Sequence, residues 1–132
     1  MEPNKLVVHF KDGHVLKGHS LDFLPNKPSF HLRSTRNPDI VAEIRMDDLK
    51  AVFFVKDFTG DPKRTDRKVF DPNARYIGKR LLVKFKDGEV FAGIRQAFNP
   101  AFPGFFISPV DSDSNTIRAF VVNSAVQSVE EV

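Results

Sequence analysis

Alternating apolar positions divide this chain into short strands. Leu6, Val8 and Phe10 stand at every second position and predict a strand over residues 5–10, because successive side chains of a strand point to opposite faces. Similar patterns predict strands over 14–23, 29–32 and 40–45. A fifth run, 51–55, is apolar at every position and therefore predicts a strand covered on both faces.

The whole pattern occurs twice. Lys-Asp-Gly follows the first strand at residues 11–13 and returns at 86–88, a spacing of 75 residues that also relates later glycines, prolines and core positions. After the third strand the spacing becomes 77, since the turn 111–115 holds two extra residues. The chain is an internal duplication, and each Lys-Asp-Gly is predicted to form a hairpin turn in which glycine takes a positive φ.

Two further features shape each half. Gly18 lies inside the second predicted strand, where glycine marks a bend or a close approach of another backbone. Residues 46–49, Met-Asp-Asp-Leu, predict a short corner or a single helical turn before the fifth strand.

The charged, turn-rich residues between the two copies divide the chain into a first domain at 1–57, a linker at 58–78 and a second domain at 79–132. Four apolar side chains of the linker are expected to pin it against the domains: Val69, Phe70, Tyr76 and Ile77.

Each half resembles the Sm-like small β-barrel. The first Sm motif is apolar-x-apolar-x-apolar, then two glycines and an aromatic residue, and it is met twice: by Leu6, Val8, Phe10, Gly13, Gly18 and Phe23, and by Leu81, Val83, Phe85, Gly88, Gly93 and Phe98. The second motif is partly met by residues 44–52 and 121–129. The resemblance implies an all-β protein of two tandem five-stranded, SH3-type barrels packed as a pseudo-dimer. The chain is also similar to an uncharacterised bacterial domain found beside PilZ and response-regulator domains.

The same resemblance suggests single-stranded RNA as a ligand. In RNA-binding Sm proteins an Asn of the third-strand loop and the Arg of the second motif hold a base. Arg45 stands at that arginine position, its counterpart in the second half is Val122, and the loops 24–28 and 99–103 lack the asparagine motif. Only Arg45 of this pocket is therefore present.

Composition is that of an ordinary globular protein. The net charge of +3 reflects 20 basic and 17 acidic residues, a mild excess that is compatible with an anionic partner. There is no cysteine for disulfides or thiolate ligands, no apolar run that spans a bilayer and no signal peptide, so we expect a cytoplasmic protein without membrane contact.

Phosphate-binding candidates are concentrated in the linker. The candidate nucleic-acid contacts are the linker cations and the two that follow them, together with Arg45 and with Phe102 as a stacking ring: Lys63, Arg64, Arg67, Lys68, Arg75, Lys79 and Arg80. Acidic residues are interspersed among them, and a charged linker is more often simply solvated.

Metal binding and catalysis find little support in the sequence. His9, His14, His19 and His31 all lie in the first half, and their counterparts are Lys84, Glu89, Ile94 and Phe106, which favours solvent-facing histidines over a metal site. No nucleophile-base pattern or phosphate-cradling glycine loop is present, and we expect neither a cofactor nor an enzyme.

The surplus of phenylalanine gives the best functional clue. Of the 14 phenylalanines, neighbours occur at Phe53-Phe54 and Phe105-Phe106, so one ring of each pair must point away from its own half. The other half or the linker is the favoured cover for these rings, and a partner surface is the alternative. We expect a non-catalytic bacterial regulatory or adaptor module that binds a protein partner or self-associates, and the competing class is an RNA-binding protein.

Overall fold

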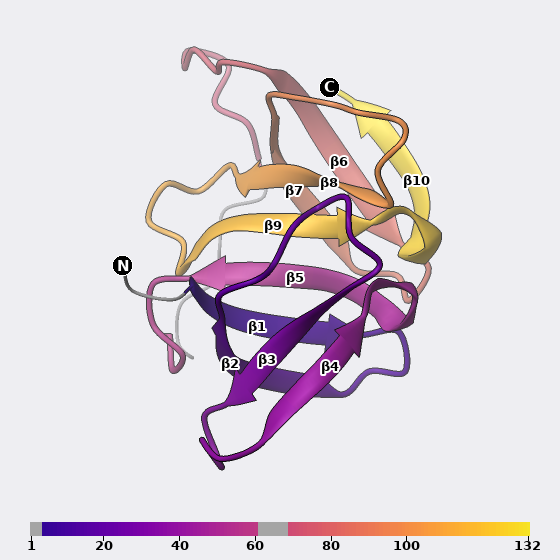
Figure 1. The fold of residues 1–132 in the computed structure, drawn as a ribbon. Coiled ribbons are helices and arrows are strands. Elements are labelled where there is room, and N and C mark those ends of the chain that lie inside the picture. The colour runs from indigo at the N-terminus through magenta and orange to yellow at the C-terminus, as the bar shows by residue number, and fades with distance from the viewer. Residues whose placement is uncertain (1–3, 61–68) are drawn as a thin grey trace.

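The computed structural model describes residues 4–60 and 69–132 and shows an all-β protein (Figure 1). The described ranges form ten strands: β1 (Asn4–Phe10), β2 (Val15–Ser20), β3 (Ser29–Ser34), β4 (Val41–Arg45), β5 (Leu49–Val55), β6 (Lys79–Phe85), β7 (Val90–Arg95), β8 (Gly104–Pro109), β9 (Thr116–Val122) and β10 (Val126–Glu131). Single 3₁₀ turns, η1 (Met46–Asp48) and η2 (Asn123–Ala125), precede β5 and β10. The turn suggested at the corner of the first half is therefore confirmed. In the described part of the chain no helix is long and apolar enough to cross a membrane.

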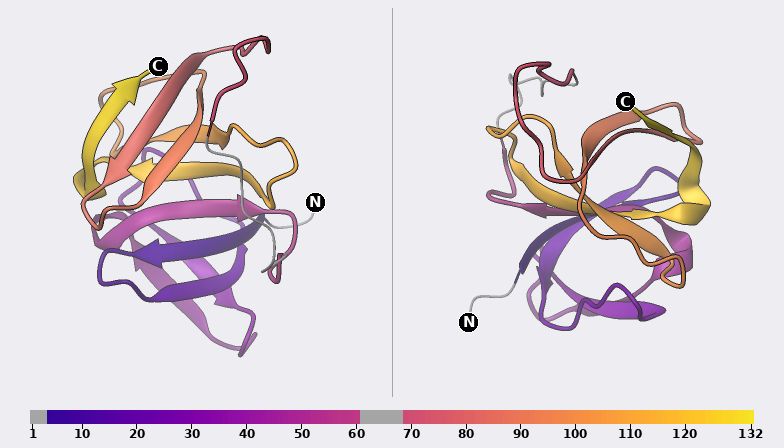
Figure 2. Two further views of the ribbon diagram at one scale, coloured as in Figure 1. Left: turned by 180° about the vertical axis from the view of Figure 1, so that it is seen from behind. Right: turned by 90° about the horizontal axis from the view of Figure 1, so that it is seen from above.

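All ten strands belong to one antiparallel sheet, in the order β10-β6-β7-β8-β9-β5-β1-β2-β3-β4. The two halves meet at the centre, where β5 of the first half pairs with β9 of the second (Figure 1). β4 and β10 are the two ends of the order, so each has one edge without a strand neighbour in the described chain. The sheet is strongly curved, and the strands of each half bend round on themselves (Figure 2).

Strand pairing is the same in the two halves, as a duplication requires. β1 pairs with β2 and β5, and β6 pairs in the same way with β7 and β10. The hairpin glycines have φ angles of 99° at Gly13 and 93° at Gly88, values that side chains rarely allow. Each Lys-Asp-Gly is thus the predicted turn between the first two strands of its half.

The close approach predicted at Gly18 is also present. A Cβ at Gly18 would collide with the carbonyl oxygen of Arg33 on β3, and one at Gly93 would collide with that of Ser108 on β8. Glycine at this position lets the third strand lie against the second at a bend that any larger residue would prevent.

The hydrophobic core has two clusters on opposite faces of the β5–β9 pair. Val52 and Phe120 face the first cluster, whereas Ala51 and Val121 face the second. β5 is buried on both faces, as its continuous apolar sequence predicts. Because Phe120 belongs to the second half but to the first cluster, each half completes the core of the other.

A charged contact also joins the two halves. Lys50 of β5, with only 10% of its side chain exposed, places Nζ 2.7 Å from Oδ2 of Asp87 and 3.0 Å from Oε1 of Glu89. Its ammonium also lies 4.7 Å from the centre of the Phe85 ring. The second Lys-Asp-Gly turn therefore binds the central strand of the sheet.

The chain that leaves β5 is held by the turn that contains the two inserted residues. The Asn115 side chain accepts a hydrogen bond from the Asp57 amide at 3.0 Å and donates one to the Asp57 carbonyl at 2.7 Å. The Asn115 carbonyl accepts a third from the Lys56 amide at 2.9 Å. The insertion thus anchors the start of the connection between the halves.

The predicted packing of that connection is wrong at two positions. Val69 and Ile77 are 72% and 83% exposed instead of pinned to the sheet. The reason is a local closure: the rings of Phe70 and Tyr76 pack on one another at 5.5 Å, and Tyr76 Oη accepts a hydrogen bond from the Asp71 amide at 2.9 Å. The segment packs on itself and leaves its aliphatic side chains in solvent.

Candidate protein-docking site

A hollow of about 390 Å³ lies on the outer surface of β2, β3 and β4, beside the free edge of β4. It combines apolar, basic and acidic side chains: His19, Leu21, Asp22, His31, Arg33 and Val41. Strand pairing places them together, since His19 is opposite Arg33, and Arg33 is opposite Val41.

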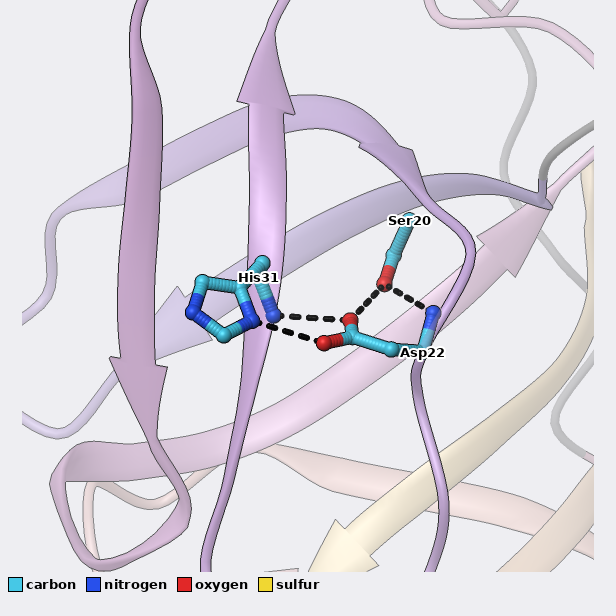
Figure 3. Close-up of polar contacts among 3 residues, drawn as sticks. All are labelled: Ser20, Asp22 and His31. Atoms are coloured by element: carbon cyan, nitrogen blue, oxygen red, sulfur yellow. Dashed lines mark hydrogen bonds and ion pairs between the residues drawn. The ribbon is translucent and has the colours of Figure 1, made fainter.

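His31 is fixed at this hollow by Asp22 (Figure 3). The two carboxylate oxygens of Asp22 accept hydrogen bonds from the His31 backbone amide at 2.9 Å and from His31 Nδ1 at 2.7 Å. The buried hydroxyl of Ser20 donates to Oδ1 of Asp22 at 3.1 Å. The second ring nitrogen, Nε2, lies on the side away from Asp22, where an incoming group can reach it.

These contacts shift both protonation equilibria. The hydrogen bond to Asp22 raises the pKa of His31 above its ordinary value of 6.5, although partial desolvation opposes this. Desolvation works against ionisation of Asp22, but the hydrogen bonds from His31 and Ser20 outweigh it and lower the pKa of that carboxyl. A proton is therefore held on the imidazole, and the hollow carries a positive charge at mildly acidic pH.

The polar groups of this hollow are largely engaged with one another. Ser20 directs its hydroxyl to Asp22 and not to His31, and a carboxylate with a lowered pKa is a weak base toward a serine hydroxyl. Arg33 is partly engaged, since its Nη1 donates to the Pro38 carbonyl at 2.5 Å. Leu21 is 81% exposed at the rim, and the site thus offers an apolar surface next to a cation.

The equivalent surface of the second half is already an interface. There the positions of His31, Val41 and Glu43 are taken by Phe106, Arg118 and Phe120. Phe106 packs 5.9 Å from Phe54 of β5, and the Arg118 guanidinium lies over both rings. On β8 and β9 this surface is covered by β5, whereas the equivalent surface on β3 and β4 is open.

The structure separates the described nucleic-acid candidates. Arg45 is the last residue of β4 at one end of the strand order, whereas Lys79 and Arg80 begin β6 beside the other end (Figure 1). Arg75 is exposed in the connection between the halves. Four further candidates lie outside the described residues: Lys63, Arg64, Arg67 and Lys68.

Phe102 lies apart from these cations, in an apolar hollow of about 150 Å³ between the β7–β8 loop and β8. Its neighbour Phe98 is 53% exposed, with the Arg95 guanidinium stacked 4.4 Å from the ring centre. An exposed aromatic ring and a cation therefore meet at the rim of this hollow.

The four candidate interface phenylalanines lie where the halves meet. Phe54 and Phe105 are buried in the clusters of their own halves. Phe53 and Phe106 are half-buried, and each packs against the cluster of the other half. Of these rings, Phe54 and Phe106 contact each other directly, with 5.9 Å between their centres.

Sequence reasoning did not select the residues of the docking hollow. The sequence predicted that His19 and His31 are solvent-facing residues. No sequence feature at Asp22 indicated that its carboxylate would orient an imidazole. The available signal was the difference between the copies, because Asp22 and His31 are replaced by Ala97 and Phe106. Among residues 4–60 and 69–132, no three His, Asp or Glu side chains converge as metal ligands would.

The fold and the site describe an all-β protein with two repeated halves in one sheet and an open surface on the first of them. The chain belongs to DUF6982, a family of unknown function, whose model matches residues 2–132. No curated protein and no solved structure matches it.

Proposed function

We propose that this protein is a non-catalytic adaptor that binds an extended segment of a protein partner along the free edge of β4. The docking surface is the β4 edge together with the hollow around His31. Binding of this kind adds a strand to a sheet, so that main-chain hydrogen bonds supply affinity and the neighbouring side chains supply specificity.

The pairing of β5 with β9 is the observation that carries this proposal. β9 is the counterpart of β4, and its outer edge takes β5 in an antiparallel ladder over Ala51 to Val55. The repeated unit is therefore built to accept a strand at this edge. In the first half the same edge has no strand beside it in the described chain.

The proposal includes the finer architecture expected from the sequence, two Sm-like barrels packed as a pseudo-dimer and related to a bacterial domain found beside PilZ and response-regulator domains. Its support is the identical strand pairing of the two halves, the bend at Gly18 and Gly93, and the one-turn corner before the last strand of each half.

RNA binding is the weaker alternative, since the described candidate cations lie on different elements. Phosphate contacts that act together must track one backbone, whereas Arg45 and the pair Lys79–Arg80 lie near opposite ends of the sheet.

The test compares partners recovered by the intact protein and by two charge variants. Val41→Glu places a carboxylate on the β4 surface, where Val41 is exposed and lines the hollow. Ile117→Glu is the matched control, because Ile117 is similarly exposed on β9. We expect a partner protein that is retained by the intact protein and by Ile117→Glu and is lost with Val41→Glu.

Equal recovery by both variants would place binding elsewhere and reject the β4 site. A salt-dependent shift with a generic single-stranded RNA, abolished by Arg45→Ala, would favour the RNA alternative instead.

A further inference from the structure

We propose that a groove between the two halves binds a small, uncharged aromatic compound that carries a hydroxyl group, such as a phenol. This seam groove is separate from the β4 edge and its hollow, and the inference goes beyond the proposed function. The groove has a volume of about 370 Å³ and is lined by residues of β1, β2 and β5 and of β7 and β9. Small-molecule sites commonly have this size and lie where two structural units meet.

The lining of the seam groove is mainly apolar and aromatic. Three half-buried phenylalanine rings come from different elements: Phe53 of β5, Phe91 of β7, and Phe58 in the chain that follows β5. The rings of Phe53 and Phe91 lie 6.2 Å apart at an angle of 47°, and the His9 imidazole meets the Phe53 ring edge-on at 4.7 Å. Because aromatic rings prefer tilted and edge-on contacts with one another, this lining favours a planar aromatic ligand over an aliphatic one.

His9 is the polar group of the seam groove that a ligand can engage. Neither of its ring nitrogens is hydrogen-bonded to a described residue. Burial and the charge of Lys50 lower the pKa of His9, and the carboxylates of Glu89 and Asp87 offset this only in part. The ring is therefore neutral at pH 7 and offers one N–H donor and one acceptor nitrogen, a pair that a hydroxyl group can satisfy.

The charged side chains that line the groove already have partners within the chain. Lys17 donates a hydrogen bond from Nζ to the Phe58 carbonyl at 2.8 Å, and Oε1 of Glu89 lies 3.0 Å from Nζ of Lys50. A charged ligand would compete with these contacts and would also lose its hydration in an apolar groove, which is unfavourable for a charge. The contacts therefore favour an uncharged ligand.

The walls of the groove are held in place by contacts that do not involve a ligand. Phe58 is fixed by the hydrogen bond from Lys17 and by an edge-on contact with the His19 imidazole at 5.1 Å. Asn115, which also lines the groove, holds the backbone of Asp57 through two hydrogen bonds. A site whose side chains are already positioned loses less conformational entropy when a ligand binds.

The comparison of the two halves shows that the fold alone does not require this lining. Three lining residues differ from their counterparts in the other half: His9 from Lys84, Phe53 from Glu130 and Phe91 from Leu16. Asn115 belongs to the turn that holds the two inserted residues of the second half. The imidazole and its aromatic neighbours therefore occur once in a duplicated chain, as expected for a ligand site and not for a packing feature of the repeated unit.

Titration of the full chain with p-cresol, followed by NMR of its backbone amides and histidine rings, tests the inference. We expect saturable binding with a dissociation constant of about 1 mM, the range for a ligand of this size. The shifts should centre on Val7, His9, Phe53 and Phe91 and leave the hollow around His31 unchanged. The anion p-toluate and the cation p-methylbenzylamine have the same ring and should each bind about tenfold more weakly.

Two variants separate the hydroxyl contact from the ring contacts. His9→Phe removes the ring nitrogens and keeps a ring beside Phe53, so it should weaken p-cresol binding about tenfold and leave toluene binding unchanged. Phe91→Leu introduces the residue of the other half and should weaken the binding of both compounds. His14→Gln is the control, because His14 lies in the β1–β2 turn outside the groove, and it should bind both compounds as the intact protein does. Circular dichroism spectra should be the same for all three variants.

Absence of saturable p-cresol binding to the intact protein would overturn the inference, as would equal p-cresol affinities of the intact protein and His9→Phe. Tighter binding of p-toluate than of p-cresol would also contradict it, because a cation and not the neutral imidazole would then govern the groove. A partner protein that is lost with Phe91→Leu and retained by Val41→Glu would show that the groove takes a side chain of another protein, and the small-molecule ligand would be wrong.

Discussion

Lys50 and Asp87 join the central strand of the sheet to the hairpin of the opposite half, with 2.7 Å between Nζ and Oδ2. The lysine side chain is almost fully buried, whereas Asp87 and Glu89 are about half exposed. Burial opposes the charge on Lys50, but the hydrogen bonds with the two carboxylates outweigh it and raise the pKa of the lysine. Loss of these two carboxylates is therefore expected to destabilise the folded protein, because the buried charge of Lys50 would have no partner.

Neutralising both acids in the double variant Asp87→Asn, Glu89→Gln leaves a buried ammonium without an anion and is expected to lower the free energy of unfolding by about 3 kcal/mol. Lys50→Met removes the buried charge itself and should cost less, about 1 kcal/mol, because the half-exposed carboxylates regain water. Urea unfolding measures both values. A double variant no less stable than Lys50→Met would show that the pair contributes nothing.

The pKa values of two histidines of the first half are expected to be shifted in opposite directions from the ordinary value. The pKa of His9 is lowered from 6.5, mainly by burial and further by the charge of Lys50, whereas that of His31 is raised by Asp22. Histidine ring resonances followed by NMR should show His31 titrating at higher pH than His9. Asp22→Asn is the control, and it should bring the His31 midpoint down without moving that of His9.

The sign of their effect on stability follows from these shifts. His9 contributes stability that is complete above its unfolded pKa near 6.5 and is lost as pH falls toward the lower folded value. His31 contributes stability that is present below 6.5 and is lost as pH rises through its raised folded pKa. In His9→Phe the decline in thermal midpoint below about pH 6.5 should be shallower than in the intact protein.

Alanine substitution at the turn glycine Gly13 and at the bend glycine Gly18 should lower the free energy of unfolding by different amounts. At Gly18 an added methyl group would collide with the Arg33 carbonyl, so Gly18→Ala must move β3 and should lower stability by about 3 kcal/mol. Gly13 has open space around it and only a positive φ, so Gly13→Ala should cost about 1 kcal/mol. Chemical denaturation of the two variants gives the comparison, and equal losses would contradict the close approach at Gly18.

Asn115 provides a similar test for the connection between the halves. Asn115→Ala removes both side-chain hydrogen bonds to Asp57 and should cost about 1–2 kcal/mol. Amide hydrogen exchange should accelerate at Asp57 and leave β1 unaffected. Asn37→Ala is a suitable control, because Asn37 makes a comparable turn contact to the Asp39 amide far from this connection.

The strands and their repetition could be predicted from the sequence. A strand with one buried face needs apolar residues at every second position, and a turn with a positive φ needs glycine, so both features determine the residue type directly. The residue types of Leu6, Val8 and Gly13 are each sufficient to predict where the residue lies, in the core or in a tight turn. The second strand ends at Ser20 and not at 23, because Asp22 turns away to bind His31 and Phe23 enters the aromatic cluster between the halves. That end is set by contacts with β3 and β8, which no local pattern contains.

The docking hollow was harder to predict for the same physical reason. Its essential contact joins Asp22 to His31 across nine positions, and its openness depends on the absence of a strand beside β4. The exposed positions of Val69 and Ile77 were missed because an apolar residue in a loop resembles an anchor until its neighbours are known. The comparison of the two copies singles out the histidines of the first half, but it contains neither the Asp22–His31 contact nor the lack of a strand beside β4 in the described chain.

The sharing of Phe120 and Val122 with the first cluster has a consequence for synthesis of the protein on the ribosome. Residues 1–57 emerge first, yet their core lacks two of its buried side chains until the last strands have been translated. The first half must therefore wait, with the apolar face of β5 uncovered, for about half of the chain to follow. A stalled or truncated chain ending before β9 would leave that strand uncovered, and it is therefore the form in which the protein would be most prone to aggregate.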